Sequence, residues 1–249
     1  MALMSPQSTM VAAGRDPWSV SEFEQRLRGI GETRYHDKHP FHQRMHAGEL
    51  SRTELRCWTL NRFCYQRALP VKDALIVSKL PSREDRRAWL RRIVDHDGAV
   101  EGVGGLERWV QLGAAMGLPE QVLWSGQGVV PAVRFAVSSY VGFCRDRPWL
   151  EAVGASLTEL FAPDLLSARV KVIETQYPWV DPAGLAYFRH RLTEQPRDIA
   201  HVLDLVLTHA NTAEGQNAVL AALEFKCDVL WALLDGIAAA PGDPDPDSA

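Results

Sequence analysis

Two helix-start signatures, together with the absence of strand alternation, constrain the fold of this chain most strongly. Ser19 with Glu22 and Ser51 with Glu54 each place a hydroxyl residue three positions before a glutamate, the pattern of a capping box at a helix N-terminus. Apolar residues at helical spacing follow both boxes, whereas no segment shows the sustained apolar–polar alternation that is typical of strands. The sequence therefore predicts an all-α fold.

The 249 residues show no internal repeat and no break in composition between residues 17 and 239. A chain of this length can bury one large core, so we expect a single domain, a helical bundle over residues 17–239. Residues 1–16 and 240–249 are polar or rich in Gly and Pro, and the second segment is also acidic. Because such segments cannot build a core, we expect both to be disordered.

Charge and cysteine content argue against several classes of protein. With 27 basic and 31 acidic residues the net charge is −4, which disfavours a general nucleic-acid binder. No stretch approaches the roughly 18 apolar residues of a membrane span, and the N-terminus lacks the features of a signal peptide. The four cysteines form no CxxC pair, as expected for reduced thiols in a cytoplasmic protein.

Lys226 interrupts the apolar face of the last expected helix. A lysine in such a position must be paired, extend its ammonium to solvent, or face a polar cavity. Because Lys226 lies in the middle of the helix, a functional role and a structural role are equally open. Its neighbours on this face are Val219, Ala222, Leu223, Val229, Leu230 and Leu233.

Tyr140 and Glu159 are two further polar residues in apolar or small-residue surroundings. For Tyr140, a buried ring with one satisfied hydroxyl is the simpler explanation. Glu159 is different, because a carboxylate in a core requires a partner that helix packing alone does not provide.

Three residue pairs at i, i+4 spacing would each project from one helix face. Any one of them is an ordinary surface feature. Arginine outnumbers lysine by 22 to 5, which reflects either genome composition or a site whose guanidinium groups bind carboxylates bidentately. Taken together, the pairs indicate an anion pocket between facing helices: Arg62 with Gln66, Arg92 with His96, and Tyr187 with Arg191.

Two histidine patterns resemble metal sites. Four histidines crowd into residues 36–46, and His96-Asp97 is similar to the core of the helical HD phosphohydrolases. Neither pattern has a carboxylate partner at a diagnostic spacing, and His39-Pro40 is more simply a helix start. We therefore expect no metal site, and the four histidines concerned are His36, His39, His42 and His46.

Longer motifs, in a fixed order, resemble the pyrroloquinoline-quinone synthase family over roughly residues 17–238. They are RYHDKHPFHQRMHAGEL (34–50), NRFCYQ (61–66), PVKDA (70–74), RIVDHDG (92–98), GGLERW (104–109), ASLTELFAP (155–163), YPWVDPAGLAYFRHRL (177–192) and EFKCDVLW (224–231). The resemblance is specific because the motifs are long and follow one another in order.

The resemblance implies a seven-helix, haem-oxygenase-like and thiaminase-related bundle that acts as a homodimer. Its implied activity is ring closure and multi-electron oxidation of a bicyclic amino-quinone to pyrroloquinoline quinone (PQQ). The precursor is a dioxo-hexahydroquinoline dicarboxylate with an aminocarboxyethyl side chain. Molecular oxygen is the implied oxidant and becomes hydrogen peroxide, without a metal or organic cofactor. The acidic C-terminal segment is also similar to a linker to a small partner protein of the same pathway.

The family's pocket residues match this sequence position by position. The resemblance implies four catalytic residues, His96, Tyr187, Arg191 and Lys226. Those that would bind substrate are His36, Arg62, Tyr65, Gln66, Arg92, Tyr140, Thr158, Glu159 and Arg169.

Two positions depart from the family pattern. Cys64 lies where a tyrosine is more usual, and Leu166 lies where some members have a histidine near the oxygen site.

Two other functions are compatible with the sequence. One is a metal-dependent oxygenase or hydrolase of the same helical superfamily. Such a relative would carry metal ligands on the helix where this chain has Tyr187 and Arg191, and these two residues are poor metal ligands. The other is a carrier that binds a quinone without turning it over.

Overall fold

The computed structural model describes residues 16–240, so the disorder expected for residues 1–16 and 240–249 falls almost entirely outside the described residues. Every regular element between residues 16 and 240 is a helix, as the sequence predicts. No helix of this part of the chain has the length and apolar character needed to cross a membrane.

Eight α-helices of 11 or more residues form the bundle, close to the seven that the family resemblance implies. They are α1 (Val20–Arg34), α3 (Arg52–Val77), α4 (Arg83–Asp97), α5 (Gly105–Ala115), α7 (Pro131–Asp146), α9 (Ala162–Gln176), α10 (Ala186–His209) and α11 (Ala213–Ala238). Shorter elements connect them: α2 (Pro40–His46), α6 (Glu120–Ser125), α8 (Trp149–Gly154), and the 3₁₀ helices η1 (His36–Lys38), η2 (Ala155–Phe161) and η3 (Pro182–Leu185).

The expected capping boxes begin the helices. Ser19 accepts a hydrogen bond from the backbone of Glu22 at the start of α1. Ser51 and Glu54 form the complete reciprocal box at the start of α3. His39 is the N-cap of α2, which confirms that His39-Pro40 is a helix start.

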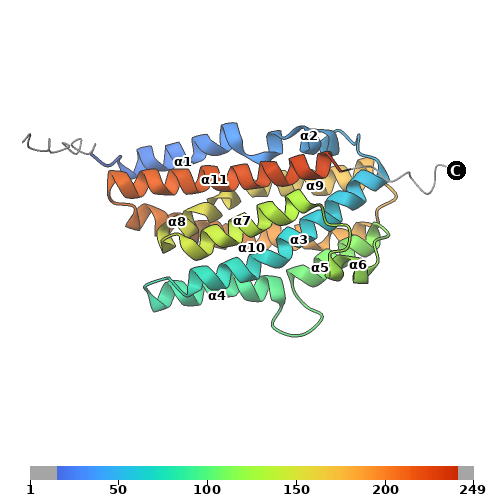
Figure 1. The fold of residues 1–249 in the computed structure, drawn as a ribbon, viewed down its shortest axis with the longest axis horizontal. Coiled ribbons are helices and arrows are strands. Elements are labelled where there is room, and N and C mark those ends of the chain that lie inside the picture. Colours follow the sequence, from blue (N-terminus) through green and yellow to red (C-terminus); the bar gives the residue numbers. More distant parts are fainter. Residues whose placement is uncertain (1–15, 241–249) are drawn as a thin grey trace, which may run out of the picture.

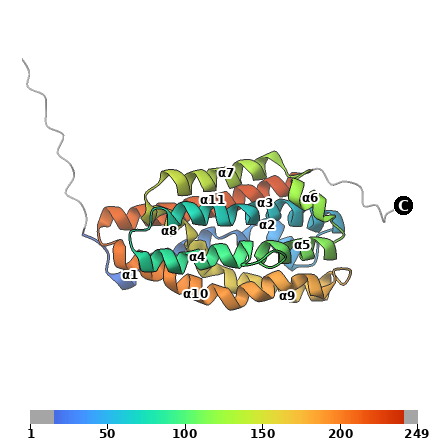
Figure 2. The same ribbon diagram turned by 90° about the horizontal axis from the view of Figure 1, so that it is seen from below.

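The long helices run along the long axis of the molecule (Figure 1). Helix α11 packs against α1 and α7, while α3 packs against α4 and α7. Seen from below, α9 and α10 lie on the opposite side of the bundle from α7 (Figure 2). This arrangement leaves α3, α9, α10 and α11 facing a common interior.

Large aromatic side chains fill one end of that interior. Trp58 and Trp109 are 1% exposed, and their ring centroids are 5.6 Å apart. Phe188 of α10 meets the edge of Trp109 at 5.7 Å. Burying rings of this size contributes much of the stability of a core, and edge-to-face contacts add to it.

A glycine-rich turn joins α4 to α5 and fixes the backbone next to His96. Gly98 has φ +88°, and a Cβ atom there would lie 1.7 Å from the carbonyl oxygen of Val103. Only glycine fits such a position, because the left-handed backbone and the close approach both exclude a side chain.

We predict that Gly98→Ala lowers the free energy of unfolding by well over ~2 kcal/mol, because left-handed strain adds to a backbone clash. Gly102→Ala is the matched control, since Gly102 has φ +78° but open space around its Cα. That variant should lose only the ~1–2 kcal/mol of the strain itself. Urea unfolding measures both, and equal losses would show that the contact with Val103 is unimportant.

Candidate functional site

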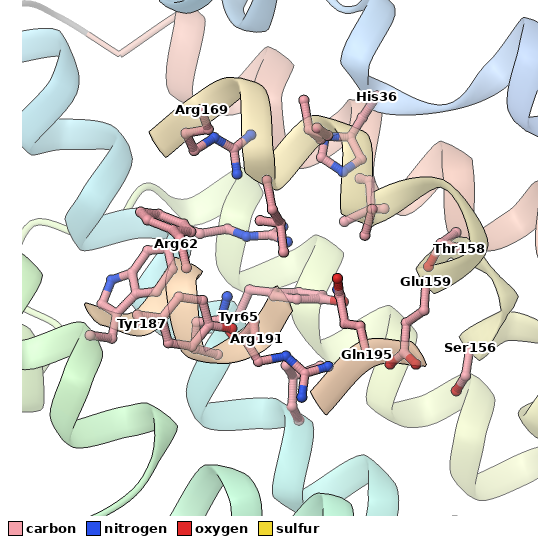
Figure 3. Close-up of a pocket in the computed structure, with 18 of the residues that line it drawn as sticks. His36, Arg62, Tyr65, Ser156, Thr158, Glu159, Arg169, Tyr187, Arg191 and Gln195 are labelled. Carbon is pink, nitrogen blue, oxygen red and sulfur yellow. Dashed lines mark hydrogen bonds between the residues drawn. The ribbon is translucent and has the colours of Figure 1, made fainter. Parts of the chain in front are cut away.

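A cavity of about 90 Å³ lies in the middle of the bundle (Figure 3). A wider surface groove of about 980 Å³ also exists, but Arg56 is the one charged residue among those described along it. The central cavity is lined by several charged and hydroxyl groups, which makes it the candidate functional site. Its volume is below that of a typical small-molecule site, so a tricyclic ligand would require the walls to move apart.

Helical periodicity explains which side chains face this cavity. On α10, Tyr187, Arg191 and Gln195 follow one another at four-residue intervals and line the same wall. On α3, the lining residues recur once per helical turn. Tyr65 and Gln66 follow Arg62 by three and four positions, and Leu69 and Lys72 follow Gln66 in steps of three.

Ten of the thirteen residues implied by the family resemblance line the cavity. Arg92, His96 and Lys226 do not line it and lie behind the lining side chains. The ten are His36, Arg62, Tyr65, Gln66, Tyr140, Thr158, Glu159, Arg169, Tyr187 and Arg191.

Arg92 supplies the partner that Glu159 was expected to need. Its Nη1 donates to both carboxylate oxygens of Glu159, at 2.8 and 2.9 Å. Its Nη2 donates to the backbone oxygen of Asp198 on α10, at 2.8 Å. Arg92 therefore ties α4 to η2 and to α10, and it holds Glu159 at the cavity wall.

Lys226 is 1% exposed and lies between two tyrosines. Its ammonium donates to the hydroxyl of Tyr65 at 2.7 Å and lies 3.3 Å from the ring centroid of Tyr140. No described carboxylate pairs with it. Burial lowers the pKa of Lys226 well below its usual value, and the neighbouring Arg62 and Lys72 lower it further.

Arg62 and Arg169 also lack an ion pair with any described carboxylate. The Arg62 guanidinium lies 4.1 Å from the ring centroid of Tyr65, and that of Arg169 lies 5.0 Å from the Trp58 ring. Burial, followed by the charge of Arg62, lowers the pKa of Arg169 to about 9. Aromatic faces support these cations, but they do not neutralise them.

Arg191 and Tyr187 are held more firmly. Arg191 donates to Glu194 at 3.0 Å and lies 3.5 Å from a carboxylate oxygen of Asp198. The Tyr187 hydroxyl donates to Gln66 at 2.9 Å. Burial raises the pKa of Tyr187, so its hydroxyl is protonated and can donate at neutral pH.

His96 lies in the last turn of α4, one turn after Arg92, and is 4% exposed. Its Nδ1 lies 3.0 Å from the carbonyl oxygen of Arg92, which can only accept, so Nδ1 carries the proton. Its Nε2 is buried without a partner. Burial, and then the charge of Arg191, lowers the pKa of His96 to about 4, so the ring is neutral near pH 7 with a free Nε2 lone pair.

The histidine-rich segment is placed against the same cavity by η1 and α2. The Nδ1 atoms of His36 and His42 are 3.0 Å apart, and the rings of His42 and His46 stack at 6.3 Å. Within residues 16–240, no group of three or more His, Cys, Asp and Glu side chains has the geometry of a metal site.

Five lining residues with a polar side-chain group were not singled out by the sequence. Gln195 continues the spacing of Tyr187 and Arg191, and Lys72 continues that of Leu69, so periodicity could have identified both. The other three, Tyr35, Trp109 and Ser156, carry no such signal and are brought to the cavity by the packing of their helices. Of the two departures from the family pattern, Leu166 lines the cavity and Cys64 does not.

Solved structures of other proteins share the helical architecture of this chain. A protein from Shewanella denitrificans described as a domain of unknown function with a heme oxygenase-like fold superimposes with a TM-score of 0.71, at 14% identity, over 89% of this chain and 92% of the other. A TenA homologue from Pseudomonas syringae gives a TM-score of 0.66, at 15% identity, over 92% and 99% of the two chains. These structures confirm the expected haem-oxygenase-like fold.

Sequence relatives are much closer. A protein of Granulibacter bethesdensis named pyrroloquinoline-quinone synthase is 48% identical over 228 residues, covering 90% of this chain and 89% of the relative. One of Rhizobium meliloti with the same name is 50% identical over 218 residues, covering 88% and 85%. The family model TENA/THI-4/PQQC matches residues 24–236. With its helical bundle and polar central cavity, the chain belongs to the TENA/THI-4/PQQC family.

Proposed function

We propose that this protein is a pyrroloquinoline-quinone synthase, an oxidoreductase that closes a ring in a bicyclic amino-quinone and oxidises it to PQQ with molecular oxygen. Relatives with this name at 48–50% identity support the proposal. Two-electron oxidation by oxygen removes two hydrogens from the substrate and forms one hydrogen peroxide, so the steps balance without another oxidant.

The observation that carries the proposal is the charge balance of the cavity. Arg62, Arg169 and Lys226 bring three cationic groups to or directly behind its wall, and none of them pairs with a carboxylate within residues 16–240. The proposed precursor and PQQ each carry three carboxylates. Buried cations are costly without a counter-charge, so a tricarboxylate is the kind of ligand that would relieve them.

Lys226 illustrates how the ligand would change the site. Burial and cationic neighbours hold the pKa of Lys226 down. A carboxylate placed near its Nζ would favour the charged ammonium and form a charge-assisted hydrogen bond. The protonated hydroxyls of Tyr65 and Tyr140 would add donors to the quinone oxygens.

His96 is the proposed residue for proton transfer. Oxidation removes protons from carbon and nitrogen, and each removal requires a base within reach. The neutral ring offers a free Nε2 lone pair, and Arg191 next to it can stabilise a developing peroxide. Because His96 lies behind the cavity lining, the wall movement that admits a tricyclic ligand must also bring the ligand to it.

We also propose that neither a metal nor an organic cofactor takes part. The donors at the cavity are mainly guanidinium, ammonium and tyrosine hydroxyl groups, which are poor ligands for iron. The reduced quinol is electron-rich and can transfer electrons to oxygen itself, so the protein supplies shape and electrostatics.

Incubating metal-stripped protein with the precursor in air tests the proposal. We expect the PQQ spectrum to appear together with hydrogen peroxide, at a rate that chelators do not change. Loss of turnover on chelation, with recovery on adding iron, would favour the metal-dependent oxygenase instead. Tight PQQ binding without conversion of the precursor would favour the quinone carrier.

We propose a cytoplasmic homodimer that receives a small-molecule precursor and oxygen, with a small pathway protein as a further partner. Four exposed apolar side chains on α4 and the loop after it support self-association, and light scattering of the purified protein measures it. These side chains are Leu90, Val94, Val100 and Val103.

We predict that Lys226→Met weakens PQQ binding by roughly tenfold to a hundredfold, because a charge-assisted hydrogen bond to a carboxylate contributes ~1.5–3 kcal/mol. The free energy of unfolding should stay the same or rise, since an unpaired buried cation is removed. Lys171→Met, on an exposed position of α9, is the control and should change neither quantity. A lower melting temperature with unchanged PQQ affinity would instead assign Lys226 a structural role.

We predict that His96→Asn still binds precursor but slows its oxidation by roughly 10²–10⁴, the usual contribution of a proton-transfer residue. The same variant also tests the lowered pKa of His96, through the pH dependence of the free energy of unfolding. The pKa of His96 is about 4 in the fold and ordinarily 6.5, so the unfolded chain binds more protons between these pH values. Wild-type stability should therefore fall as pH drops from 6.5 towards 4, and His96→Asn should lose less. Oxidation at the wild-type rate would show that His96 only caps α4.

A further inference from the structure

His42 lies behind the cavity wall and contacts two of its lining residues. It is 2% exposed and does not itself line the cavity. Its Nδ1 is 3.0 Å from the Nδ1 of His36 and 3.0 Å from the carbonyl oxygen of His36. Its Nε2 is 3.3 Å from an Nη of Arg169. One imidazole therefore connects η1 with α9.

Two independent contacts determine which nitrogen of His42 carries its proton. The His36 carbonyl can only accept, so the His42 Nδ1 facing it must be the donor. The Arg169 guanidinium can only donate, so the His42 Nε2 facing it must be the acceptor. Both contacts require the same neutral ring, protonated at Nδ1.

The protonation of His36 then follows. Two protonated Nδ1 atoms cannot lie 3.0 Å apart, so the Nδ1 of His36 must be an acceptor towards His42. In the neutral ring the proton of His36 is on Nε2. His36 lines the cavity, and its ring points into the interior (Figure 3).

We infer that His42 is a positioning residue that fixes His36 as an Nε2–H donor and holds Arg169, so that both present N–H groups to one oxygen-rich side of the substrate. This inference rests on the proposed function, and it adds a residue that does not touch the substrate. His36 would thus bind an oxygen atom of the quinone or of a carboxylate, and it would not act as a base.

The charges around His36 act in the same direction. Arg62 on α3, Arg169 on α9 and Lys226 on α11 face it, together with His39 at the start of α2, and each opposes a positive charge on the ring. Burial has the largest effect and also lowers the pKa of His36. His36 is therefore kept neutral by its whole surroundings, while His42 selects its tautomer.

Two substitutions at His42 separate its two contacts. In His42→Asn the side-chain amide can place an N–H donor near the former Nδ1 position, which retains the hydrogen bond to His36. In His42→Gln the longer amide can place its oxygen near the former Nε2 position, which retains the acceptor for Arg169. His46→Asn is the control, because His46 stacks on His42 but has no hydrogen bond to His36 or Arg169.

Nitrogen NMR of ¹⁵N-histidine-labelled protein without ligand reads the tautomers directly, with His36 assigned by its loss in His36→Gln. We expect an unprotonated Nδ1 and a protonated Nε2 for His36 in the wild type, in His42→Asn and in His46→Asn. In His42→Gln the His36 tautomers should mix, and PQQ affinity should fall about threefold to tenfold, as for a lost neutral hydrogen bond.

A protonated Nδ1 on His36 in the wild type would overturn the inference, and this measurement does not depend on any variant folding. An unchanged tautomer and unchanged PQQ affinity in folded His42→Gln would overturn it as well. Failure of the wild type to oxidise the precursor would contradict the proposed function, while the NMR result on the ligand-free protein would still decide the role of His42.

Discussion

Unpaired positive charge in the centre of the bundle is the constraint on which the site depends. Arg169 and Lys226 are almost fully buried, and neither has an acidic partner among the described residues. Contacts with aromatic faces return about 0.5–2 kcal/mol each, which is less than the several kcal/mol that burying an ion costs. An anionic ligand would offset this cost, and the offset would contribute to its binding energy.

A second set of charges is fully paired and keeps the walls in place. Asp198 is central to it, because its carboxylate contacts Arg191 and Arg197 and its backbone oxygen accepts from Arg92. Removing one partner of such a buried network leaves the other charge buried and unpaired, which lowers the stability of the fold more than forming the pair had raised it. These contacts therefore resist rearrangement. The paired cations therefore hold the walls of the site in place, and the unpaired cations are the ones that a ligand can bind.

Neutrality is the other property that burial imposes. His36, His42 and His96 all have lowered pKa values, chiefly because their rings are buried. Each ring is therefore a fixed donor and acceptor near pH 7, and its hydrogen bonds decide which nitrogen plays which part. Burial lowers the pKa of Lys226 as well, and a carboxylate near its Nζ would raise it again.

The sequence by itself determined the helical architecture, because capping boxes and apolar periodicity are local signals. Ser19, Ser51 and His39 are the N-caps of helices, as these signals predict. It also identified ten of the lining residues through family motifs, and the apolar face around Lys226 identified a buried cation directly behind the wall. Only the tertiary structure decided that Arg92 pairs with Glu159 whereas Lys226 has no acidic partner in the described part of the chain. Such pairings join helices far apart in the chain, and helical spacing within one segment carries no information about them.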